Sequence, residues 1–242
     1  METKREPMRE LEPKQGVYAA HFDVLGMSNL LSRSTSRAWL ILCDLAKASD
    51  ENELPISEES RQGLVERFFS DTIVIRTNDD SSGSLHTILA RCFELFRCAF
   101  RSGIPIRGGV AHGTWIESST GRQDLFTGTA LSEAYRVGET QQMLSVAVCK
   151  NTQKAFSKIP FTLREGAPAL VSYNVPLKRG SEQRDALNWP AISELELGQN
   201  NEPTTKEIAD RFTEFGKFED LDKKSKQKYI NTAEFIKSVL AS

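Results

Sequence analysis

The alternation of apolar and polar positions near the N-terminus predicts a strand, a turn and a helix. Residues 17–22 form an apolar run that ends at Asp23. Gly26 follows, and glycine lets the backbone adopt conformations that strain other residues. Apolar side chains then recur at helical spacing, which predicts a helix from about 28 to 48. The chain therefore begins with a strand that has an aspartate at its end.

Two β-rich runs follow a polar loop. Residues 63–69 and 72–77 are rich in β-branched and aromatic side chains, and only Ser70 and Asp71 separate them. Such a short connection is typical of a hairpin. We expect Asp71 at the tip of this hairpin.

The middle of the chain predicts a second helix and further strands. Apolar residues recur at three- and four-residue spacing from 85 to 100, which indicates an amphipathic helix. Strands are expected at 104–116 and 144–148, and between them residues 125–129 lead into a helix that carries Arg136. The order β-α-β-β-α-β is typical of an α+β fold of the split βαβ (ferredoxin-like) type, which we expect to have its helices on one face of the sheet.

The C-terminal part of the chain changes character. The segment 177–203 mixes charges, and 206–241 shows helical spacing. We divide the chain into an N-terminal extension (1–15), a main domain (16–178) and a largely helical C-terminal appendage (179–242). The appendage either packs on the core or offers a surface to a second copy or another partner.

Composition excludes several classes of protein. The chain has 242 residues, of which 39% are hydrophobic and 26% charged, as in ordinary globular proteins. A net charge of −2 argues against a nucleic-acid partner. Residues 1–15 resemble neither a signal peptide nor an anchor, and no apolar run reaches the ~20 residues of a membrane span, so no membrane partner is expected. The four cysteines lack paired spacing, which indicates reduced thiols in a cytoplasmic protein.

The aspartates at the strand end and the hairpin tip are candidate metal ligands. In a split βαβ sheet these two places are neighbours, so Asp23 and Asp71 should lie together. Two carboxylates can hold two divalent ions, Mn²⁺ or Mg²⁺, and the carbonyl group of Val24 could complete the set. A single strand-end aspartate more often caps a helix, so it is the pair that predicts a metal site.

The turn after Asp23 is a candidate phosphate-binding segment. The backbone amides of Leu25, Gly26, Met27 and Ser28 enter a helix N-terminus, where amides and the helix dipole favour anions. Beside two metal ions, such a turn suits the attack of a ribose 3′-oxygen on an α-phosphate with pyrophosphate as the leaving group.

Four motifs resemble those of the class III nucleotidyl cyclases. They are FDVLG at 22–26, FSD at 69–71, RGG at 107–109 and ALSEAYR at 130–136. The resemblance covers residues 17–148 and implies a homodimeric catalytic domain whose active sites lie between the subunits. It implies that Asp23 and Asp71 hold the metals and that Phe22 belongs to the nucleotide-binding segment. It also implies that Arg136 stabilises charge on the α-phosphate.

Two residues depart from the family pattern and indicate one group within the family. Ser132 stands where the family has an asparagine, and Ser70 replaces the glycine before the second aspartate. With these residues the set is similar to the pyrimidine cyclases of the bacterial Pycsar antiphage systems. That similarity implies manganese-dependent formation of 3′,5′-cyclic UMP or CMP, which activates a separate effector. We place Ser132 beside Arg136 as a candidate catalytic residue.

Arg67 and Asp124 occupy the positions that the resemblance implies for base recognition. Arg67 lies four residues before Asp71, and the second position lies close before the glycine that opens the Arg136 helix, near Asp124 or Leu125. An arginine donates hydrogen bonds that suit the carbonyl oxygens of uracil, which favours UTP over CTP. A surface charge on an edge strand explains Arg67 equally well.

Two other functions remain possible for such a chain. One is a catalytically silent cyclase-fold module that binds a nucleotide or a protein, against which the retention of Asp23, Asp71 and Arg136 argues. The other is a metal phosphohydrolase, which would need more histidine or carboxylate ligands than the motifs provide. We therefore expect a uridylate cyclase.

Overall fold

The computed structural model describes residues 12–47, 63–119, 124–156, 161–163, 166–191 and 203–241. Its strands are β1 (Lys14–Val24), β2 (Leu64–Phe69), β3 (Thr72–Thr77), β4 (Ile106–Ser119), β5 (Asp124–Thr127), β6 (Val146–Val148), β7 (Leu170–Pro176) and β8 (Ser181–Leu187). Its α-helices are α1 (Met27–Arg33), α2 (Thr35–Lys47), α4 (Ser82–Arg101), α5 (Thr129–Thr140), α6 (Lys150–Phe156), α7 (Thr205–Asp210) and α8 (Lys223–Leu240). Short 3₁₀ turns are η1 (Trp189–Ala191), η4 (Thr213–Phe215) and η5 (Phe218–Asp220).

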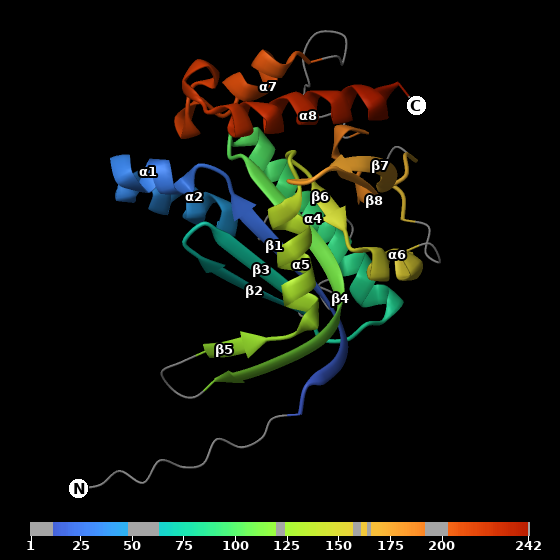
Figure 1. Ribbon diagram of the computed structural model, residues 1–242. Coiled ribbons are helices and arrows are strands. Elements are labelled where there is room, and N and C mark those ends of the chain that lie inside the picture. The colour runs from blue at the N-terminus through green and yellow to red at the C-terminus, as the bar shows by residue number, and fades with distance from the viewer. Residues whose placement is uncertain are drawn as a thin grey trace, which may run out of the picture.

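A mixed sheet forms the centre of the molecule. Within the described residues the strand order is β2-β3-β1-β4-β6-β8-β7, and β5 pairs with β4 outside this path. β1 is antiparallel to both of its neighbours, β3 and β4, whereas β4 and β6 run parallel. Figure 1 shows the C-terminal helices α7 and α8 lying across the end of the sheet at which β1 terminates. The predicted α+β fold with a split βαβ order is confirmed.

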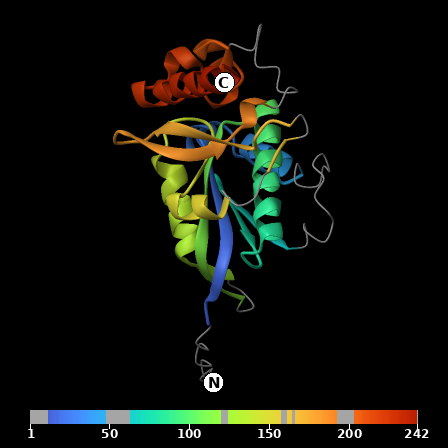
Figure 2. The ribbon, with the colours of Figure 1, turned by 90° about the vertical axis from the view of Figure 1, so that its right-hand side faces the viewer.

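Helices cover both faces of the sheet, so the expectation that they share one face is wrong. Successive side chains of β1 point to opposite faces. Val17 and Ala19 pack with Ala130 of α5, whereas Phe22 belongs to the larger core that includes α4. Figure 2 shows α4 and α5 on opposite sides of the sheet. The odd-numbered residues of β1, which include Asp23, therefore face α5.

Glycine at position 109 allows α5 to rest directly on the sheet. A Cβ atom on Gly109 of β4 would lie 2.3 Å from the carbonyl oxygen of Ala134 and 2.8 Å from the amide nitrogen of Gly138. No side chain fits into such a space, so the backbones of β4 and α5 make direct contact. The RGG motif thus fixes how closely α5 approaches the sheet.

Gly109→Ala is expected to lower the free energy of unfolding by about 1–3 kcal/mol, because the added methyl group must push α5 outward. Gly83→Ala is the matched control, since a Cβ atom there, in the first turn of α4, meets only Ser81 Oγ at 3.9 Å. Alanine also favours a helix over glycine, so the control should not lose stability. Urea unfolding of both variants measures the difference, and equal stabilities would contradict a fixed contact at Gly109.

The helix expected at 28–48 is in fact two helices. Between them Ser34 is extended, with φ −160° and ψ 102°. Its Oγ accepts a hydrogen bond from the amide of Arg37 at 3.2 Å. Serine side chains compete in this way with helix continuation, and the apolar periodicity across the break does not reveal it.

The remaining elements agree with the sequence pattern in part. β2 and β3 form the predicted hairpin, with Ser70 in its turn at φ 54°. The pattern does not predict β7 and β8, which form a second hairpin. β8 also pairs with β6, so the sheet continues past residue 178, and the first α-helix after it in the described part of the chain is α7. No helix in the described parts of the chain is long and apolar enough to cross a membrane.

Candidate active site

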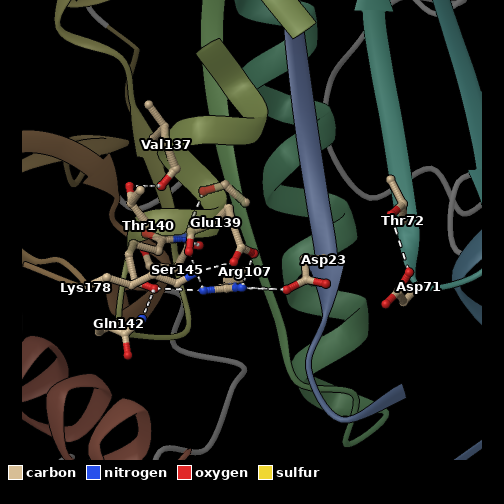
Figure 3. Close-up of polar contacts among 12 residues, drawn as sticks. Asp23, Asp71, Thr72, Arg107, Val137, Glu139, Thr140, Gln142, Ser145 and Lys178 are labelled. Carbon is tan, nitrogen blue, oxygen red and sulfur yellow. Dashed lines mark hydrogen bonds and ion pairs between the residues drawn. The ribbon is translucent and has the colours of Figure 1, made fainter. Parts of the chain in front are cut away.

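The candidate metal ligands Asp23 and Asp71 lie at the same end of the sheet. Asp23 is opposite Thr72 in the β1–β3 register, and the amide of Val24 donates to the carbonyl oxygen of Asp71 at 2.8 Å. Figure 3 shows Asp23 on β1 and Asp71 beside it, directly before the start of β3. The strand pairing therefore brings together the two residues that the sequence analysis paired.

Arg107 holds the carboxylate of Asp23. It lies opposite Asp23 in the β1–β4 register, and its Nε and Nη2 atoms are 3.0 and 2.9 Å from Asp23 Oδ2. The guanidinium also donates to the Glu139 carboxylate at 2.5 Å and to the carbonyl oxygens of Glu139 and Gln141, each at 3.0 Å. Only 5% of the Arg107 side chain is exposed. These charge-assisted bonds replace the water that a buried guanidinium loses.

Arg107 is a residue of this site that the motifs did not single out. In the sequence it is only the first member of the RGG motif. A signal was present, because an arginine between Ile106 and Val110 interrupts an apolar strand, and a buried guanidinium needs an anionic partner. The strand alternation then places it on the same sheet face as Gly109, toward α5.

Glu139 of α5 joins this cluster from the other side. Burial disfavours its charged form, but the hydrogen bond from Lys178 and the charges of Arg107 and Lys228 outweigh burial, so its pKa lies below the ordinary value. The residue is thus a carboxylate at neutral pH. His21 of β1 lies beside the same groups, and burial lowers its pKa, so its imidazole is neutral at pH 7.

The turn at the end of β1 supplies backbone amides. Gly26 has φ 78° and ψ 5° and precedes α1. The amide of Leu25 is already engaged by the carbonyl oxygen of Pro105 at 2.8 Å. The amides of Gly26, Met27 and Ser28 lie where a helix begins and lack acceptors within that helix. Of the predicted phosphate-binding amides, these three are the ones that suit an anion.

Phe22 does not face this site. Its side chain is 0% exposed and belongs to the core, where it packs beneath Gly108. The resemblance implied that Phe22 belongs to the nucleotide-binding segment. The structure corrects this for the side chain, which lies in the core. Its ring anchors the strand that carries Asp23.

Arg136 and Ser132 lie four residues apart on the exposed side of α5. Arg136 Nη2 is 2.5 Å from Glu133, and 56% of the Arg136 side chain is exposed. Glu133 also accepts a hydrogen bond from the thiol of Cys149 at 3.7 Å. Among the described residues, the ion-pair partner of Arg136 is Glu133 and not Asp23. A single chain therefore does not bring the predicted arginine onto the predicted metal ligands.

Arg67 and Asp124 lie toward the β4–β5 arm. The guanidinium carbon of Arg67 is 5.0 Å from the ring centre of Phe126, and its Nη2 is 3.5 Å from Glu117. Through the registers of β2, β3 and β1, Arg67 is on the same sheet face as Asp23. Asp124 opens β5, and its side chain lies outside the described part of the structure.

The oxygen donors at the end of β1 suit a hard divalent cation. Asp23 and Asp71 offer carboxylates and Val24 a carbonyl oxygen, the ligand types that Mg²⁺ and Mn²⁺ prefer. Over the residues that the structure describes, no group of three or more His, Cys, Asp or Glu side chains is arranged to hold a metal. A metal site here would therefore depend on the two aspartates.

Comparison with known proteins gives matches among solved structures. No protein-family model matches the sequence, and neither does any curated protein. The monomeric guanylyl cyclase domain of the RhoGC fusion protein from the aquatic fungus Blastocladiella emersonii has a TM-score of 0.54 and 15% identity, over 74% of this chain and 98% of that one. A dimeric guanylyl cyclase domain of the same protein has a TM-score of 0.53 and 14% identity, with the same coverage of 74% and 98%.

A third similar structure contains a nucleotide analogue. It is the catalytic core of a rhodopsin-guanylyl cyclase with converted specificity in complex with ATPαS, with a TM-score of 0.52 and 15% identity over 73% of this chain and 98% of that one. Identities this low establish the fold alone. The chain accordingly has the fold of the class III cyclase catalytic domains, as the motifs around Asp23, Asp71 and Arg136 implied.

Proposed function

We propose that this protein is a nucleotidyl cyclase that converts UTP to 3′,5′-cyclic UMP and pyrophosphate, with CTP as the alternative substrate. The observation that carries the proposal is the meeting of Asp23 and Asp71 at the end of β1, on a cyclase fold. The motif resemblance to pyrimidine cyclases supports UTP or CTP as the substrate. A catalytically silent module would not require two carboxylates at this place.

Asp23 and Asp71, with the carbonyl oxygen of Val24, would hold two Mn²⁺ or Mg²⁺ ions. Bound there, the metals supply an activated ribose 3′-hydroxyl and neutralise phosphate charge. Arg107 fixes the orientation of the Asp23 carboxylate by donating twice to Oδ2. This arrangement leaves Oδ1 of Asp23 for a metal ion.

The phosphates would be bound by backbone amides and by arginine. The amides of Met27 and Ser28, at the start of α1, would bind the β- and γ-phosphates. Arg136 would stabilise charge on the α-phosphate bound to the other subunit of a homodimer, because its guanidinium is exposed on α5. Ser132, one turn earlier on the same side, would help to position that phosphate. The contact of α5 with Gly109 would keep both residues at a fixed height above the sheet.

Incubating the purified chain with UTP, CTP, ATP and GTP separately, each with Mn²⁺, tests the function. Mass spectrometry of the products should show cyclic UMP, or cyclic CMP, and pyrophosphate. Binding of a nucleotide without turnover would instead support the silent module. Release of inorganic phosphate without a cyclic product would support a phosphohydrolase.

A mixture of two inactive variants tests the shared site. Asp71→Ala and Arg136→Ala should each be inactive alone and partly active when mixed, since one interface of the mixed dimer regains a complete set of residues. Exchange of subunits is first verified with two differently tagged chains. Asp71→Ala mixed with Asp23→Ala is the control, because both changes fall on the same half-site. Absence of rescue despite exchange would indicate sites built within one chain.

Arg67→Ala tests base selection. We expect the ratio of kcat/KM for UTP to that for CTP to fall by about tenfold, because a hydrogen bond that distinguishes the two bases would be lost. Arg179→Ala, an exposed arginine in the β7–β8 turn, is the matched control. An unchanged ratio would mean that Arg67 does not select the base and has a structural role, through its contacts with Glu117 and Phe126.

The product would act as a second messenger in the cytoplasm. By the resemblance to the Pycsar cyclases, cyclic UMP would activate a separate effector during phage infection. Cyclic UMP measured in cells that express the wild type or an Asp71 variant, before and after infection, tests this role. Equal levels in both cell lines would contradict it.

A further inference from the structure

The guanidinium of Arg107 is shared between two carboxylates that come from different elements. Its Nη2 atom donates one hydrogen to Asp23 Oδ2 of β1 at 2.9 Å and the other to Glu139 Oε2 of α5 at 2.5 Å. Its Nη1 atom donates to the carbonyl oxygens of Glu139 and Gln141, each at 3.0 Å. Glu139 is therefore the second anionic partner of the cation that holds Asp23.

Glu139 is held in turn by Lys178. The ammonium group of Lys178 forms a salt bridge with Glu139 Oε1, whereas Arg107 bonds to Oε2. The backbone amide of Lys178 also donates to the carbonyl oxygen of Thr140 at 2.7 Å, which fixes the lysine beside the end of α5. Figure 3 shows Arg107 between Asp23 on one side and Lys178 on the other. The side chains form a row of alternating charge, which runs Lys178, Glu139, Arg107, Asp23.

The charge that Asp23 offers to a cation depends on how Arg107 is shared. A carboxylate paired with a buried guanidinium alone has most of its negative charge offset, so it attracts a divalent ion weakly. Glu139 is also a carboxylate at neutral pH, and it draws on the same positive charge. Two carboxylates on one guanidinium leave a negative charge beside the candidate metal site. Lys178, whose side chain is 50% exposed, offsets part of the Glu139 charge from the solvent side.

We propose that Glu139 is a positioning residue that raises the affinity of Asp23 for a divalent cation, and that Lys178 lowers this affinity by acting on Glu139. By accepting the second Nη2 hydrogen of Arg107, Glu139 keeps the guanidinium on Asp23 Oδ2 and leaves Oδ1 for the ion. By its charge, Glu139 compensates a guanidinium that would otherwise neutralise Asp23. The inference rests on the proposed function in taking Asp23 as a metal ligand, and it depends on neither the nucleotide nor the reaction.

Glu139→Gln and Lys178→Gln test the inference, because they should change the metal affinity in opposite directions. Glu139→Gln keeps an acceptor for Arg107 but loses the charge, and we expect the Kd for Mn²⁺ to rise about tenfold, the usual scale for a group that orients a metal ligand. Lys178→Gln removes the charge that offsets Glu139, and we expect the Kd to fall about twofold, since this pair is partly exposed. Mn²⁺ is titrated by calorimetry without nucleotide, and the site is identified as the binding that Asp23→Asn loses.

A second lysine–glutamate–arginine group in the same chain is the matched control. Lys150 forms a salt bridge with Glu182 at 2.6 Å, and Glu182 forms another with the buried Arg184. The side chains of Lys150 and Glu182 are 60% and 29% exposed, close to the 50% and 32% of the lysine and glutamate in the first row. Among the described residues, however, the ion-pair partner of Arg184 is Glu182 and not Asp23. Lys150→Gln and Glu182→Gln should therefore leave the Kd for Mn²⁺ unchanged.

A double variant separates the row of contacts from a general effect of charge. Because Lys178 acts through Glu139, Lys178→Gln should have no further effect on the Kd in a Glu139→Gln background. Thermal unfolding first shows which variants are folded. If Glu139→Gln does not fold, the exposed Lys178→Gln decides alone, and an unchanged or higher Kd in that variant would overturn the inference.

The outcomes for this inference and for the proposed function are distinct. An unchanged Kd in folded Glu139→Gln, equal changes in the control variants, or a Lys178 effect that persists in the double variant would overturn the inference and leave the cyclase proposal standing. The expected shifts in a protein that forms no cyclic nucleotide would support the inference and contradict the proposed function. A wild-type protein that binds no Mn²⁺ at Asp23 would overturn both.

Discussion

Asp23→Asn and Asp71→Asn are each expected to reduce kcat for nucleotide cyclisation by at least about 10²-fold, the scale on which one preorganised electrostatic group contributes. Each change removes a negative charge from the proposed metal site. Asparagine keeps the shape of the side chain and an oxygen acceptor. Arg107 therefore keeps a partner at position 23, together with its bonds to Glu139 and Gln141, and the fold should remain intact.

The measurement pairs product formation with thermal unfolding. Asp44→Asn is the control, since Asp44 is an exposed carboxylate on α2 that takes no part in the Asp23 cluster. It should leave kcat unchanged. Substantial turnover in a folded Asp23 or Asp71 variant would show that the two carboxylates are not metal ligands.

Trp189→Ala is expected to lower the free energy of unfolding by about 3–5 kcal/mol, the usual cost of removing a large buried aromatic side chain. Trp189 is 0% exposed. Its ring centre lies 4.9 Å from that of Phe96, 5.0 Å from that of Phe100 and 6.2 Å from that of Phe235. Because the residue joins α4 to α8, its loss should also weaken the attachment of the C-terminal helix.

Trp39→Ala is the matched control for this prediction, because 65% of Trp39 is exposed. Its effect should stay within about 0.5 kcal/mol. Among the residues that the structure describes, the indole nitrogen of Trp189 has no hydrogen-bond partner, so the variant loses no such bond. Urea unfolding of both variants gives the comparison, and similar stabilities would mean that the aromatic cluster is not part of the stable core.

Local patterns predict the parts of the fold that local physics determines. The hairpin at 64–77 follows from two β-rich runs and a two-residue connection, and α4 follows from its apolar periodicity. The meeting of Asp23 and Asp71 was predictable because it needs only the pairing of the first strand with that hairpin. For the hairpin and for α4 the residues that determine the structure lie within the element itself, whereas the meeting of Asp23 and Asp71 also needs the long-range pairing of β1 with β3.

Long-range contacts determine the features that the pattern does not predict. β8 carries Glu182 and Arg184, and such charged residues are typical of a loop. Its pairing with β6 and β7 nevertheless holds it in the sheet. The side of the sheet on which α5 packs depends on the space left by Gly109. Asn231 and Thr232 attach α8 to the segment between α5 and β6, far away along the chain, which no spacing within α8 indicates.

The central position of β1 has a consequence for the kinetics of folding. Ala19 pairs with Arg76 on one side and with Ala111 on the other. Both edges of β1 therefore stay unpaired until β3 and β4, which lie much later in the chain, have been synthesised. Pairing over such sequence separations closes long loops and slows folding. During synthesis on the ribosome, an apolar strand with two open edges would be exposed to chaperones or to other chains until β4 emerges. The bonds of Asp23 to Arg107 of β4 can form no earlier than that step.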